Sequence, residues 1–186
     1  MLPFLLAATL VAAIAAATDF RTGRIPNWLT AGGIVAGLVG HTAVGWLDGG
    51  WRAALTHGGL AVVGAVFCAI APVIMFWRGA MGGGDVKLYA AIGALCHPML
   101  GIEAQMYSLI AAAILAPARM AYEGKLFRAL GGALRVLLNP FRPRAKRTVV
   151  PAEAMTWFRL GPAIFLGTVM TLVAHAYVLM PPTAAP

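Results

Sequence analysis

Apolar stretches long enough to cross a lipid bilayer follow one another along most of this chain. A backbone inside hydrocarbon must satisfy its own hydrogen bonds, so such stretches predict helices. One crossing of the hydrocarbon core, which is about 30 Å thick, takes about 20 residues. We therefore predict an all-α, polytopic membrane protein with about six transmembrane helices in a single membrane-embedded domain over residues 1–186. The expected spans are approximately 2–18, 28–47, 53–77, 86–100, 102–121 and 160–180.

The composition excludes an ordinary water-soluble enzyme. Hydrophobic residues make up 61% of the chain and charged residues only 11%, whereas a soluble domain carries about 25% charged residues. The formal net charge is +8, which in a soluble protein would suggest nucleic acid as a partner. In a membrane protein this charge is better explained as cytoplasmic anchoring charge, so no nucleic-acid partner is expected.

The basic residues predict an orientation. With the N-terminus outside and six alternating spans, Arg52 is the only one of the 14 Lys and Arg residues at the outer face. Cytoplasmic loops of membrane proteins carry an excess of Lys and Arg, which favours this topology over its inverse. The same topology places Asp19 and Asp85 at the cytoplasmic face, although neither residue was used to derive it.

One long polar segment, residues 123–150, lies between the fifth and sixth expected spans. Leucines and Phe127 recur there at helical spacing, with basic residues between them. This pattern predicts a cytoplasmic basic amphipathic helix on the inner leaflet. Its expected partners are the anionic headgroups of the lipid bilayer.

A glycine-rich turn that ends in an aspartate separates two of the apolar stretches. Gly82, Gly83 and Gly84 precede Asp85, and the whole chain contains only six acidic residues. A carboxylate at a membrane boundary is costly to desolvate and indicates a functional site. An N-cap role for Asp85 would explain the aspartate alone. It does not explain three glycines, which would let an extended peptide approach a loop free of side chains.

A second aspartate, Asp19, ends the first expected span. Two carboxylates that cannot both ionise leave one base and one acid, which together can activate water against a peptide bond. On the expected helix ends, Asp19 faces the negative end of its helix and Asp85 the positive end of the helix that follows it. The helix macrodipoles then predict Asp19 as the protonated partner and Asp85 as the anion.

Three segments resemble a known family. D-F-R-T-G-R-I-P-N-W-L-T at 19–30 and M-G-G-G-D-V-K-L at 81–88 resemble the two signature segments of bacterial type IV prepilin peptidases, which are G-x-G-D membrane aspartic proteases. R-L-G-P-A-I-F-L-G at 159–167 resembles the segment that opens their last span. The resemblance implies that Asp19 and Asp85 are the catalytic dyad of a hydrolase without a cofactor. It implies as substrate the leader peptide of a pilin-like precursor, cut at the cytoplasmic face of the bacterial inner membrane.

The chain begins directly with its first span and lacks the paired C-x-x-C motifs of the bifunctional members. In this it is similar to the short peptidases of tight-adherence (Flp) pilus systems. This leaves open whether the protein also N-methylates the product, and no metal site is expected. Residues expected to shape the substrate entrance are Arg21, Pro26, Asn27 and Lys87. Simpler explanations stand beside these roles: a topology signal for the arginine, a turn for the proline and an interfacial lysine.

Two other functions compete with the peptidase. The aspartates could form the relay of a small proton- or cation-coupled transporter, or the chain could be a catalytically silent pilus or secretion assembly factor. A relay is expected near the membrane midplane, often within inverted repeats. Here both carboxylates are predicted at one face, which favours the peptidase. No sequence pattern specifies an oligomeric state.

Overall fold

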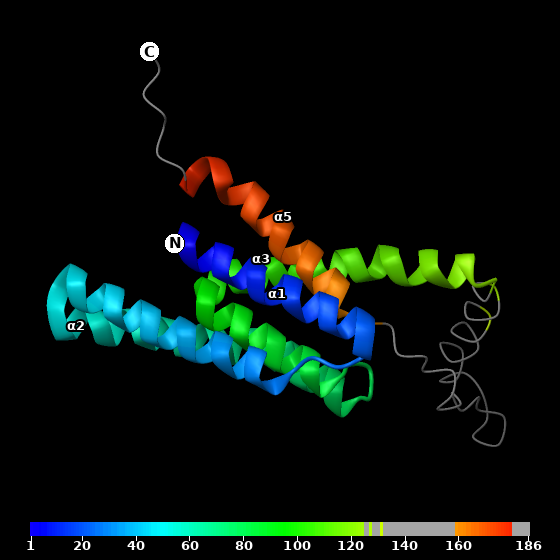
Figure 1. Cartoon of the computed structure of the whole chain (residues 1–186), viewed down its shortest axis with the longest axis horizontal. Coiled ribbons are helices and arrows are strands. Elements are labelled where there is room, and N and C mark those ends of the chain that lie inside the picture. Colours follow the sequence, from blue (N-terminus) through cyan, green and yellow to red (C-terminus); the bar gives the residue numbers. More distant parts are fainter. Residues whose placement is uncertain (125–126, 128–130, 132–158, 180–186) are drawn as a thin grey trace, which may run out of the picture. The chain divides into compact units, whose positions relative to one another are not determined.

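The computed structural model describes residues 1–124, 127, 131 and 159–179. These residues form helices and no strands, which confirms the predicted all-α class for the described part of the chain. The helices are α1 (Leu2–Thr22), α2 (Asn27–Trp77), α3 (Gly83–Tyr122) and α5 (Gly161–Leu179), as Figure 1 shows. The amphipathic segment predicted over 123–150 lies almost entirely outside the described residues.

Three of these helices are long and apolar enough to cross a membrane: α1, α2 and α3. Helix α5, with 19 residues, is apolar as well. Helix α2 has 51 residues, and at 1.5 Å per residue a straight helix of that length would extend for about 75 Å. That is more than twice the thickness of the hydrocarbon core, so α2 must reverse direction in order to stay in a bilayer.

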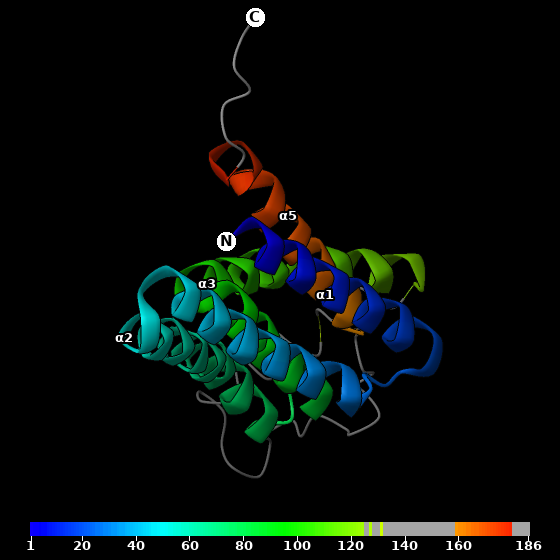
Figure 2. The ribbon, with the colours of Figure 1, turned by 60° about the vertical axis from the view of Figure 1, so that its left-hand side comes forward.

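Helix α2 does reverse, at two consecutive glycines. Gly49 and Gly50 have non-helical backbone angles, and Gly50, with φ 69° and ψ −155°, lies in a region that glycine adopts most readily. The two halves then pack against each other, and a Cβ on Gly58 would lie 2.5 Å from Oγ1 of Thr42. Figures 1 and 2 both show this reversal. The halves correspond to the predicted spans 28–47 and 53–77.

Helix α3 also contains one break, at His97, where φ is 63° and ψ is 171°. The predicted spans, approximately 86–100 and 102–121, meet close to this break, which lies a few residues earlier in the chain. The next residue, Pro98, disfavours the helical conformation for His97, which explains the position. Gly101 instead provides close contact between the two halves, because a Cβ there would lie 3.0 Å from Cα of Gly93.

The contacts divide the chain into two compact units, Met1–Ala111 with Arg159–Pro186, and Ala112–Phe158. In the second unit, an exposed ion pair of 3.1 Å joins Arg119 to Glu123 one turn further along α3. The first unit contains the hydrophobic core and every residue of the site described below.

The core of the first unit is built largely from small residues. Ala8, Ala12 and Ala15 of α1 are fully buried beside Leu88 and Ile92 of α3. Lipid chains are as apolar as leucine, so helices in a bilayer associate through close backbone packing, which small residues permit. Large apolar side chains face outward instead, including Leu10, Leu47, Ile114 and Trp77. This arrangement suits a protein whose surroundings are lipid.

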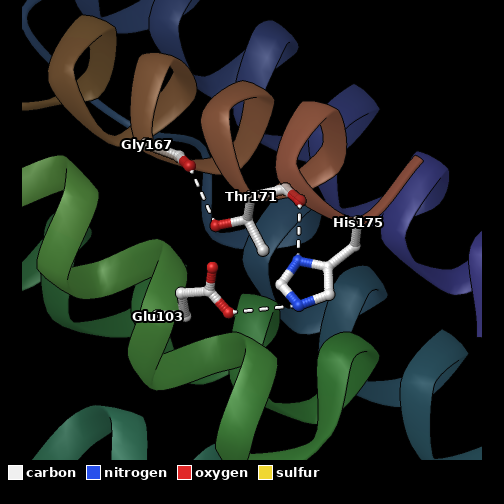
Figure 3. A network of polar contacts seen from close by, with 4 residues as sticks. All are labelled: Glu103, Gly167, Thr171 and His175. Carbon is white, nitrogen blue, oxygen red and sulfur yellow. Dashed lines mark hydrogen bonds and ion pairs between the residues drawn. The ribbon is translucent and has the colours of Figure 1, made fainter. Parts of the chain in front are cut away.

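A polar contact joins α3 to α5 within the same unit. Nε2 of His175 lies 3.5 Å from a carboxylate oxygen of Glu103, and Nδ1 of the same ring donates to the carbonyl of Thr171 at 3.1 Å. Thr171 in turn donates to the carbonyl of Gly167 at 3.1 Å. Figure 3 shows the imidazole of His175 pointing across to Glu103. The partly exposed pair holds the later part of α5 against α3.

Candidate active site

Asp19 lies in the last turn of α1, not in the polar loop where the sequence pattern placed it. The helix continues to Thr22 and ends at Gly23, whose φ of 67° is the left-handed conformation of a common C-terminal cap. The Gly23 amide donates to the carbonyl of Asp19 at 2.9 Å. Asp19 is therefore held on rigid helix, and its residue is only 7% exposed.

Asp85 lies in the first turn of α3, which begins at Gly83. Gly83 and Gly84 therefore belong to the helix and not to the predicted loop, whereas the expected role of Gly82, Gly83 and Gly84 toward the substrate stays a prediction. The carbonyl of Gly82 accepts the amide of Asp85 at 3.2 Å and so starts the helix. A Cβ on Gly84 would lie 3.2 Å from Cβ of Ile25, so the third glycine allows close packing between the two signature segments.

A second contact joins the same two segments. Nζ of Lys87 donates to Oδ1 of Asn27 at 2.8 Å. Asn27 is the first residue of α2, and Pro26 before it has the extended backbone of an N-cap position. Lys87 thus has a partner in the protein, and its expected role at the substrate entrance stays a prediction. Arg21, also predicted near the entrance, is exposed in the last turn of α1.

The two aspartates interact electrostatically. Asp85 lies in the first turn of α3, one residue before the predicted span 86–100. Burial and, secondly, the negative charge of Asp19 raise the pKa of Asp85 from 3.8 to about 6, against an opposing backbone hydrogen bond from Gly82. Ionisation of the second carboxylate is thus penalised, as a pair that shares a proton requires.

The raised pKa of Asp85 runs against the expectation, drawn from the helix macrodipole, that Asp85 is the anion. A rise in pKa from 3.8 to about 6 corresponds to about 3 kcal/mol in favour of the neutral acid. A helix terminus contributes only about 0.3–1 kcal/mol at such a position. At Asp85, burial therefore outweighs the helix dipole, and the neutral form of this carboxyl group is favoured.

The start of α5 completes the surroundings of Asp19. The amide of Gly161 donates to Oδ2 of Asp19 at 3.1 Å in a buried contact. Nearby, the guanidinium of Arg159 donates to the carbonyl of Phe20. The sequence pattern marked 159–167 as the opening of the last span but did not reveal these contacts. The only sequence signal for them was the glycine–proline pair at 161–162, which marks a helix start but does not specify a partner.

An apolar helical unit with two interacting carboxylates at helix ends is the arrangement that a membrane-embedded aspartic peptidase requires. Comparison with known families matches residues 5–117 to the type IV leader peptidase family. The match covers more than half of the chain, including both aspartates and the glycine turn, so the protein belongs to the type IV leader peptidase family. Searches of curated proteins and of solved structures gave no significant match. Helix α5 lies beyond the matched residues.

Proposed function

We propose that this protein is an aspartic endopeptidase that removes the leader peptide from type IV or Flp-type prepilins. Family membership supports a leader peptidase. The observation that carries the proposal is the pair of acidic side chains on α1 and α3, in which burial and, secondly, the charge of Asp19 raise the pKa of Asp85. Such coupling is expected of two carboxylates that divide the roles of base and acid.

In the proposed reaction, water attacks the carbonyl carbon of the leader junction. Asp19 takes a proton from this water, and Asp85 donates its proton to the carbonyl oxygen. The tetrahedral intermediate then collapses with proton transfer to the leaving amine, which breaks the C–N bond. This assignment follows the raised pKa of Asp85, because the acid must be protonated at the start.

We further propose that cleavage occurs at the cytoplasmic face of the bacterial inner membrane, in a protein of six spans with its N-terminus outside. The breaks at Gly49–Gly50 and His97 support this by dividing α2 and α3 into shorter helical halves. The distribution of Lys and Arg supports the orientation. The apolar helix of the precursor would lie among the spans and bring its leader junction to the aspartates.

The test is co-expression with a tagged Flp-type precursor, with removal of the leader followed by mass. Asp19→Asn and Asp85→Asn should each abolish cleavage at unchanged protein level. Asp48→Asn is the matched control, because Asp48 is the remaining aspartate of the chain and is exposed. It should cleave like the wild type. Cleavage that survives both dyad substitutions would exclude the aspartic mechanism and direct attention to an ion relay.

A further inference from the structure

Helix α5 begins against the side chain of Asp19. The carbonyl of Leu160 accepts the amide of Ile164 at 2.9 Å, which closes the first turn of α5. The first amides of a helix have no partner within it and need an acceptor from elsewhere. Oδ2 of Asp19 accepts the first of them, from Gly161 at 3.1 Å. Asp19 thus caps a helix far from it in sequence, and Figures 1 and 2 show the two helices side by side there.

Only glycine fits at position 161. A Cβ on Gly161 would lie 2.8 Å from Oδ2 and 2.9 Å from Cβ of Asp19, and 3.2 Å from Cα of Ala16. The last of these atoms belongs to the backbone of α1 and cannot move aside as a flexible side chain could. Any larger residue would therefore displace either the Asp19 carboxylate or the whole start of α5.

Arg159 holds the end of the helix that carries Asp19. Its guanidinium donates to the carbonyl of Phe20 and lies over the Phe20 ring, 6.0 Å from the ring centre. This carbonyl is one of the last in α1 and has no partner within the helix. A cation at a helix C-terminus is also favourable to the helix dipole. The contact therefore fixes the backbone immediately after Asp19.

We propose that Arg159 and Gly161 are positioning residues that orient Asp19, Gly161 through Oδ2 and Arg159 through the backbone of Phe20. The inference rests on the proposed peptidase function and adds two residues from outside the matched part of the chain. With Oδ2 engaged by the amide, Oδ1 is the oxygen left to accept the proton of water. Orientation matters because a displacement of about 1 Å at a catalytic group can cost about 100-fold in rate.

The kinetic test uses purified protein and purified precursor. Gly161→Ala should lower kcat by about 10- to 100-fold with little change in KM, because the substitution displaces the base and not the substrate. Its matched control is Gly59→Ala, since a Cβ on Gly59 would meet nothing within 4 Å. Arg159→Gln should also lower kcat, and Arg159→Lys should restore part of it because lysine can still donate to the Phe20 carbonyl. Arg52→Gln serves as the exposed control.

A second readout does not depend on cleavage. The chain has three aspartates, Asp19, Asp48 and Asp85, so selective carboxyl ¹³C labelling gives three aspartate resonances that Asn substitutions assign. Gly161→Ala and Arg159→Gln should move the resonance of Asp19 and leave that of Asp48 in place. Gly59→Ala should move neither.

The two readouts separate the inference from the proposed function. If the wild type cleaves but both Gly161→Ala and Arg159→Gln keep its kcat and the Asp19 resonance, the positioning role is wrong and the peptidase stands. If the wild type cleaves no precursor, the proposed function fails and the resonance of Asp19 still decides the contact. If Gly161→Ala does not fold, the Arg159→Gln variant decides. A role limited to folding would change only the amount of folded protein, so a wild-type kcat per folded molecule and an unmoved Asp19 resonance in Arg159→Gln would overturn the positioning role.

Discussion

The raised pKa of Asp85 implies that this carboxylate destabilises the protein at neutral pH. Asparagine resembles the protonated acid in size and cannot ionise, so Asp85→Asn should remove the penalty. The full rise from 3.8 to about 6 corresponds to about 3 kcal/mol. Because Asp85 is only partly buried and water can relax around it, we expect about 1–3 kcal/mol of stabilisation at pH 8. For a protein of this size that is about 2–10 °C in Tm.

The sign follows from proton linkage. The folded protein binds the proton of Asp85 more tightly than the unfolded chain, so wild-type stability falls as the pH rises from about 4 to about 6. The advantage of Asp85→Asn should therefore be small near pH 4, grow across this window and stay constant above it. Asp48→Asn, at an exposed site, should have no such profile.

Thermal unfolding in detergent can be followed by intrinsic tryptophan fluorescence. The chain has five tryptophans, and their emission can be read at pH 4 as well as at pH 8, whereas a thiol-reactive dye would need the thiolate. A Tm for Asp85→Asn at pH 8 equal to or below that of the wild type would refute the reasoning. So would a difference between the two proteins that does not change between pH 4 and pH 8.

Three further predictions concern the same unit. The rate of cleavage should fall about tenfold per pH unit above about pH 6, because Asp85 loses the proton that it must donate. A rate that stays constant from pH 6 to pH 8 while chemistry is rate-limiting would contradict this. Lys87→Ala should lower the free energy of unfolding by about 0.5–1.5 kcal/mol, because it removes the hydrogen bond to Asn27. Melting curves of the double variant should show that Asn27→Ala causes little further loss. If the two losses add fully, the contact contributes nothing. Gly93→Ala should destabilise the protein by about 1–3 kcal/mol and lower its Tm, because a Cβ at this position would overlap the backbone of α2. Gly59→Ala, where a Cβ would lie in open space, should not lower the Tm. Equal melting temperatures of the two variants would contradict the close packing.

The apolar pattern predicted the helical class and the positions of most helices, because the demand for internal hydrogen bonds in lipid acts on each segment separately. It placed the end of α1 too early. Asp19 and Arg21 are polar, but the left-handed cap at Gly23 extends the helix beyond the apolar stretch. The break of α3 at His97 was also readable in principle from the following proline.

The pairing of Asp19 with Asp85 could be expected from topology, because the orientation derived from Lys and Arg places both aspartates at one face. The raised pKa of Asp85 could not. It depends first on the burial of Asp85, which is a property of packing between distant segments. The contact of Gly161 with Asp19 was hidden for the same reason, because only the folded chain brings the start of α5 to the end of α1.

The central claim is that the coupled aspartates cut a pilin leader, and purified components test it most directly. The protein in detergent would be mixed with a purified Flp-type precursor and the products weighed by mass spectrometry, beside Asp85→Asn and the control Asp48→Asn. The account predicts one cut at the leader junction by the wild type and by Asp48→Asn, and an intact precursor with Asp85→Asn. Cleavage by Asp85→Asn at the wild-type rate would contradict it.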